Sequence, residues 1–79
     1  MKTALERVAG RYLRRHNVPV GSIYDAGNGV TVRIGTRRAE RCLLGCLAGL
    51  ERRLSRTVVA ARLRPGTHIV RVRRWDGRY

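Results

Sequence analysis

The 79-residue sequence has few acidic residues, few cysteines and no long apolar run. Its five acids are scattered along the chain, at Glu6, Asp25, Glu40, Glu51 and Asp76. A metal-dependent nuclease would need carboxylates gathered around its ion. The two cysteines stand four residues apart on a predicted helix, which suits neither a disulfide nor a structural zinc site. We therefore expect a protein that is not an enzyme and that holds no metal and no cofactor.

The absence of long apolar runs excludes two further classes of protein. No segment approaches the roughly 20 apolar residues of a membrane span, and the N-terminus lacks the apolar stretch of a secretory signal. We expect a cytoplasmic protein that does not bind membranes. Residues 1–79 form one small domain, and a domain of this size has a small core and modest stability, so a homodimer would be unsurprising.

Positive charge is what the sequence has in excess. Lysine and arginine number 18 against five acids, which gives a net charge of +13 at pH 7. Self-repulsion of this size destabilises a compact monomer, so an anionic partner would offset it. Nearly all the basic residues are arginine, whose planar guanidinium binds phosphate in bidentate fashion. A GC-rich genome would also favour arginine over lysine, but it does not explain the net charge.

Hydrophobic periodicity predicts a helix and a hairpin in the first half of the chain. Thr3 with Glu6 forms a capping box, and apolar residues at helical spacing continue the helix to His16. Residues 21–26 can form a short strand, a glycine-rich loop follows, and residues 30–34 alternate apolar and polar positions. This pattern is typical of a β-hairpin with one apolar face.

The second half of the chain repeats this order. Thr36 is placed to cap a helix that runs to about Leu54, with Cys42 and Cys46 on its core-facing side. The run TVVAARLR, a Pro65-Gly66 turn and the run THIVRVRRW then predict a second hairpin. We therefore expect an α+β fold in αββαββ order, a four-stranded antiparallel sheet with two helices on one face and a basic open face.

Alternation in the second hairpin separates its two faces. The residues expected on the helix side are Val59, Ala61, Leu63, His68, Val70 and Val72. Ile69 is expected on the opposite face with the arginines. Arginines opposite one another on neighbouring strands repel, and a phosphate backbone laid across them would relieve this repulsion, while an aromatic beside them could stack on a base. The predicted nucleic-acid-binding residues are Arg33, Arg62, Arg64, Arg71, Arg73, Arg74, Trp75 and Arg78.

A second basic surface is predicted on the outer side of the helices. Its residues are Arg7, Arg11, Arg14, Arg15, Arg37, Arg41 and Arg52. Gly45 and Ala48 lie between the arginines of the second helix and would allow a partner to approach closely. An ordinary solvated helix face would show the same pattern, just as a charged sheet face can serve only to block aggregation.

These patterns favour a non-catalytic nucleic-acid-binding protein that grips the phosphate backbone of DNA or RNA through an arginine-rich sheet face. The alternative is a small adaptor or inhibitor, of the kind encoded by phages and plasmids, that docks its basic face on an acidic protein partner. Both hypotheses rest on the same charges, so the sequence leaves both open.

Overall fold

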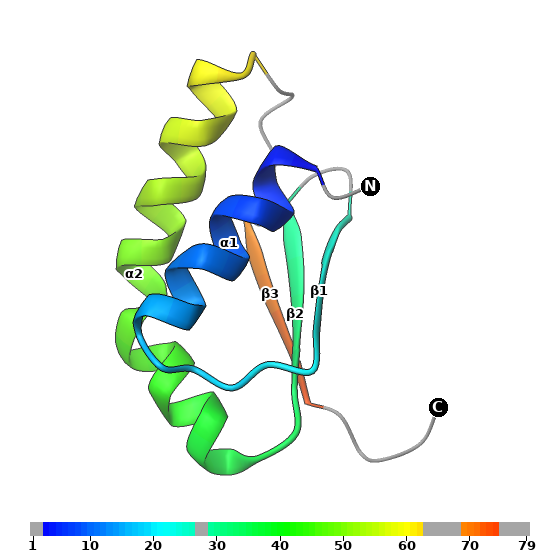
Figure 1. The fold of residues 1–79 in the computed structure, drawn as a ribbon, viewed down its shortest axis with the longest axis vertical. Coiled ribbons are helices and arrows are strands. Elements are labelled where there is room, and N and C mark those ends of the chain that lie inside the picture. The colour runs from blue at the N-terminus through cyan, green and yellow to red at the C-terminus, as the bar shows by residue number, and fades with distance from the viewer. Residues whose placement is uncertain (1–2, 27–28, 63–68, 75–79) are drawn as a thin grey trace.

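The computed structural model describes residues 3–26, 29–62 and 69–74, and Arg74 by its backbone only. Its elements are α1 (Ala4–Arg15), β1 (Ser22–Asp25), β2 (Val30–Ile34), α2 (Arg37–Ala60) and β3 (Val70–Arg74) (Figure 1). The described residues therefore form an α+β fold in αββαβ order, with two helices and a three-stranded mixed sheet.

Helix α1 begins and ends where the sequence predicts. The Thr3 hydroxyl accepts a hydrogen bond from the Glu6 amide at 3.3 Å. At the other end, the Asn17 amide donates to the Arg14 carbonyl and the Val18 amide donates to the Leu13 carbonyl. Asn17 adopts a left-handed φ of 56°, and Val18 is buried. This pair of bonds is a Schellman motif, which satisfies the last carbonyls of the helix and turns the chain back toward the core.

Glu6 does more than the predicted capping box requires. Its carboxylate accepts a hydrogen bond from the Asp25 amide at 2.8 Å, so it also joins α1 to β1. Asp25 lies on the edge strand of the sheet. The carboxylate therefore satisfies a backbone donor at an edge that would otherwise be left open to pairing with another chain.

The sheet has the order β1-β2-β3. The antiparallel pairing of β1 with β2 confirms the predicted first hairpin. Strand β3, in contrast, runs parallel to β2, and α2 is the crossover between them. The prediction of a four-stranded antiparallel sheet is therefore wrong for the described residues, both in the number of strands and in the direction of β3.

The prediction of a fourth strand fails because α2 continues to Ala60 and does not end near Leu54, so it includes the first part of the segment predicted as that strand. Leu50, Leu54 and Val58 recur every fourth residue and all pack on the core, so the helical face carries through the β-branched run. Val59, predicted on the core face of a strand, is 79% exposed. Residues 63–68, which hold the rest of the predicted hairpin and its turn, lie outside the described residues.

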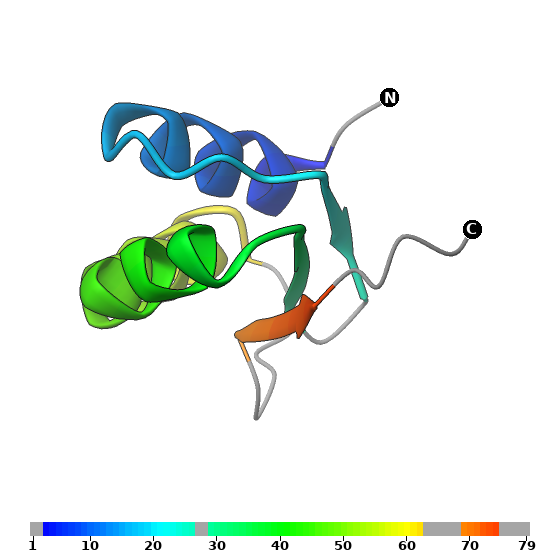
Figure 2. The same ribbon diagram turned by 90° about the horizontal axis from the view of Figure 1, so that it is seen from below.

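Both helices cover the same face of the sheet (Figure 2). The predicted two-layer arrangement is therefore confirmed, and the core lies between the layers. Its buried residues are Leu5, Ala9, Leu13, Val18, Val30, Val32, Ile34, Ala39, Leu43, Leu50 and Leu54. Val70 and Val72 pack against this core as predicted. Two assignments are corrected: Ile69 also packs against the core and not on the open face, and Cys42 is exposed.

Gly49 allows the two helices to approach each other. The Tyr12 hydroxyl of α1 donates to the Cys46 carbonyl of α2 at 3.3 Å, and a Cβ at position 49 would collide with that hydroxyl. Gly45, one turn earlier on α2, has open space around it. Of these two glycines, only Gly49 is required by packing.

Alanine substitutions at these two glycines should have opposite effects. We expect Gly45→Ala to stabilise the protein by about 0.5–1 kcal/mol, because alanine loses less backbone entropy in a helix. Gly49→Ala should destabilise it by about 1 kcal/mol, since the displaced Tyr12 ring outweighs that gain. Urea denaturation measures both free energies of unfolding, and equal effects would contradict this account of the helix contact.

The neighbouring valines near the end of α2 test its length. Val58→Ala should cost about 1 kcal/mol because Val58 packs on the core, whereas Val59→Ala should change stability by less than about 0.5 kcal/mol. A β-strand in this segment would give the reverse order. The same denaturation measurement distinguishes the two cases.

Candidate functional site

The face of the sheet that points away from the helices carries two rows of side chains. Because Val30, Val32 and Ile34 are buried against the helices, the alternate residues of β2 point the other way. The strand register then places two rows across the sheet: Tyr24, Thr31 and Arg71 in one, and Ser22, Arg33 and Arg73 in the next. We call these six residues the open face. No described helix lies on it (Figure 2).

Arg33 and Arg73 are direct partners in the parallel pairing of β2 with β3. Arg71 lies two residues before Arg73 on the same strand, and the Arg33 guanidinium reaches the other way, over Tyr24 of β1. Arg71 and Arg73 are exposed, and Arg33 is half-buried. Like charges on directly opposed residues destabilise a sheet. The register therefore places three arginines on one face of the sheet.

Tyr24 is an aromatic residue of the open face that the sequence analysis missed. It is 37% exposed, and the Arg33 guanidinium carbon lies 5.5 Å from the centroid of its ring. This is the geometry of a cation–π contact. Counting outward from the glycine-rich loop pairs Tyr24 with Thr31, which lies on the same face of β2 as Arg33, so the register of the predicted hairpin could have indicated its position.

The structure describes only part of the predicted sheet site. Arg33, Arg71 and Arg73 lie together on the open face, as predicted. Arg62 does not: it follows the C-terminus of α2 with a left-handed φ of 53°, because the helix replaces the predicted strand. Arg74 ends β3, where its backbone pairs with Ile34. The predicted residues Arg64, Trp75 and Arg78 lie outside the described residues.

The helices carry the second basic surface. Every arginine on α1 and α2 is exposed, including the predicted Arg7, Arg11, Arg14, Arg15, Arg37, Arg41 and Arg52. Arg11 and Arg15 of α1 meet Arg53 of α2 around a pocket of about 210 Å³ between the helices. Arg53 was not predicted, because only the crossing of the helices brings it beside α1. This surface is broad, and its residues project from two helices instead of one flat sheet.

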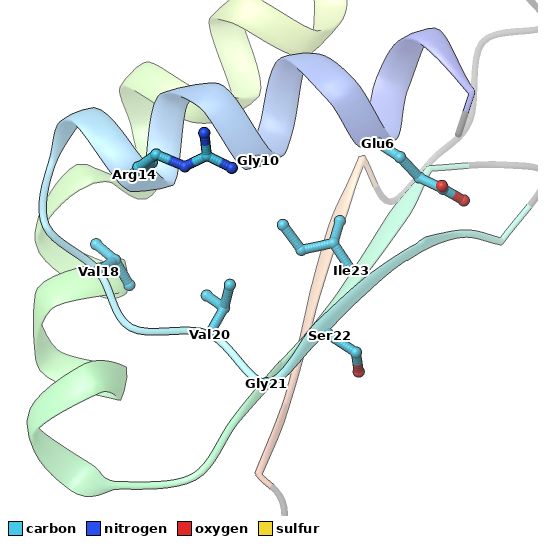
Figure 3. A pocket seen from close by; sticks show the side chains of 8 residues that line it. All are labelled: Glu6, Gly10, Arg14, Val18, Val20, Gly21, Ser22 and Ile23. Carbon is cyan, nitrogen blue, oxygen red and sulfur yellow. The ribbon is translucent and has the colours of Figure 1, made fainter. Parts of the chain in front are cut away.

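A larger pocket of about 420 Å³ lies between α1 and β1. Figure 3 shows the Glu6 carboxylate and the Arg14 guanidinium well apart along α1, with Ile23 between them and Val18 and Val20 below Arg14. The Glu6 carboxylate already accepts the Asp25 amide. This pocket shares only Ser22 with the open face, so it is a separate feature of the fold.

Neither cysteine belongs to a recognisable reactive centre. Burial raises the pKa of the Cys46 thiol, which donates to the Leu43 carbonyl at 3.4 Å. A raised pKa keeps the less nucleophilic thiol form. Among the described residues, no three histidine, cysteine or acidic side chains come close enough to hold a metal ion.

Two further results bear on what the protein can contact. No helix in the described part of the chain is both long and apolar enough to span a bilayer. Comparisons with protein-family models, with curated proteins and with solved structures each find no match. The protein is a two-layer α+β domain with exposed arginines on the outer side of both layers.

The repulsion between Arg33 and Arg73 can be measured by a double-mutant cycle. We expect Arg33→Gln and Arg73→Gln to reveal a repulsive coupling of about 0.2–1 kcal/mol at low salt. Contacts that either arginine makes elsewhere, including the one with Tyr24, cancel in the cycle. The coupling should shrink near 1 M salt, where the screening length falls to about 3 Å. An attractive or salt-independent coupling would contradict the arrangement described here.

Proposed function

We propose that this protein binds nucleic acid without catalysis, by phosphate contacts from the arginines of the open face. The observation that carries the proposal is the grouping of Arg33, Arg71 and Arg73 on a sheet face that no described helix covers. Arg33 and Arg73 are register partners on adjacent strands, so one short stretch of a polyanion can contact both.

The distribution of charge supports a polyanion as the partner. The net charge of +13 exceeds what the chain's own acids can neutralise, and exposed arginines lie on both layers. A nucleic acid presents a continuous row of phosphates that can pass from the open face to the helices. Counterion release would then supply most of the affinity, and binding would depend little on base sequence.

Each part of the surface has a distinct role in this proposal. Arg71 and Arg73, exposed on β3, contact phosphates directly. Arg33 is half-buried and lies against Tyr24, so it is held in place more firmly than the other two. The helix arginines add long-range attraction, which speeds association, but they need not contact the ligand at a fixed position.

Charge reversal on the two surfaces tests the proposal. We expect Arg71→Glu with Arg73→Glu to abolish most binding of labelled DNA and RNA, and to reduce the magnitude of the slope of log affinity against log salt by about 2. Arg11→Glu with Arg14→Glu changes the net charge equally and should weaken binding far less. Fluorescence anisotropy between about 50 and 200 mM salt measures both quantities.

The outcomes separate the proposed site from its alternatives. A larger effect of the α1 pair would move the site to the helices. If the unaltered protein binds every nucleic acid only weakly, and binding is lost near 200 mM salt, the arginines instead serve a folded acidic protein. Circular dichroism of each double variant shows whether the fold is retained, which is expected because all four arginines are exposed.

A further inference from the structure

We infer that Tyr24 is a stacking platform for an unpaired base, so that the preferred ligand is single-stranded nucleic acid. This inference rests on the proposed function and names the class of ligand that the open face recognises. It begins from a residue that the proposed phosphate contacts leave unused.

The position of Tyr24 is not explained by packing. The ring belongs to the open face, opposite the core that α1 and α2 cover, and it remains 37% exposed. Many polar or β-branched side chains would suit this partly exposed strand position equally well, so the fold does not require a tyrosine there. The exposed part of the ring is an aromatic surface that no described helix covers, and such a surface is suited to a flat partner.

The neighbours of Tyr24 favour a base as that partner. The Arg33 guanidinium carbon lies over the Tyr24 ring, 5.5 Å from its centroid, so it restrains the ring and adds a planar cation on which a base can also stack. Arginine planes and tyrosine rings are the groups on which proteins stack unpaired bases. A base that contacts this pair gains a stacking interaction that is independent of base identity, because every base has an aromatic face.

The two rows also provide a path for the backbone of the strand. Arg71 lies in the same row as Tyr24, two strand spacings or about 10 Å away, with Thr31 between them. Thr31 is small and only 7% exposed, so a strand that passes between the ring and the arginine would contact the side chains that cover Thr31 and not Thr31 itself. A nucleotide whose base stacks on Tyr24 can therefore direct its phosphate toward β3, where Arg71 and Arg73 are exposed.

A duplex cannot use this arrangement in the same way. Its bases are stacked on one another, and a base must leave the helix before its face can reach Tyr24, at a cost of a few kcal/mol. The arginines bind the phosphates of either form. Tyr24 should therefore determine the preference for single strands over duplex. The arginines should determine the salt-dependent part of the affinity for both forms.

Substitutions of Tyr24 separate the two contributions. We expect Tyr24→Leu, which keeps apolar bulk but removes the aromatic ring, to weaken binding of a single strand of about 12 nucleotides by about tenfold. Binding of the duplex of the same sequence should change by less than about twofold, and the salt slope should not change, since no phosphate contact is lost. Tyr24→Phe keeps the ring and should retain single-strand binding.

The measurement is fluorescence anisotropy of both labelled forms at one fixed salt concentration and across a salt series. Val59→Ala is the matched control, because it removes an exposed apolar group from α2 without altering the sheet. Tyr24→Ala serves as a second variant, and circular dichroism verifies the fold of each. Loss of single-strand binding in both Tyr24→Leu and Tyr24→Ala, but not in Tyr24→Phe, supports the inference.

Three outcomes would overturn it. They are a preference of the unaltered protein for the duplex, equal weakening of both forms by Tyr24→Leu, and weakening of neither form by that substitution. In each of these cases the salt-dependent binding through Arg71 and Arg73 would still stand, so the proposed function would survive. Absence of salt-dependent binding to either form would remove both proposals together.

Discussion

The burial of one face of β2 is the constraint on which the rest of the structure depends. Val30, Val32 and Ile34 are fully enclosed beneath α1 and α2. Because side chains alternate along a strand, this burial directs Thr31 and Arg33 to the opposite face. The neighbouring strands follow the same register, so Tyr24 of β1 and Arg71 and Arg73 of β3 share that face. Packing of the core therefore assembles the candidate site.

The two layers contribute differently to the surface chemistry. The helices present arginines on curved surfaces, where each side chain can move away from its neighbours. The sheet holds Arg33 and Arg73 as direct partners on adjacent strands, at a fixed separation of backbones. The spacing of these two positions is therefore set by the sheet, whereas their side chains can still turn apart, as that of Arg33 does toward Tyr24. A set of helix arginines with greater total charge need not be the stronger binding site.

Stability and binding are in tension in this domain. The small core has to hold together a chain with a net charge of +13, and contacts such as the Glu6 carboxylate with the Asp25 amide use part of the limited acidic content to secure the sheet edge. A polyanion that binds only the folded state would raise the apparent stability through mass action. The same charges that oppose folding of the free protein would then favour the complex.

The sequence by itself determined the local elements: Thr3 and Thr36 mark the helix starts, Asn17 and Val18 end α1, and alternation defines the first hairpin. These features depend on neighbouring residues, so they can be read from short windows. Only the tertiary structure decided where α2 ends, that β3 runs parallel to β2, and that Tyr24 lies beside Arg33. Residues 57–60 have strand-like composition, but Val58 continues a core-facing helical stripe that Leu50 and Leu54 establish. Packing of Val58 against the core therefore extends α2 through the segment predicted as a strand. As a result α2 connects two parallel strands, and Arg73 of β3 pairs with Arg33 of β2.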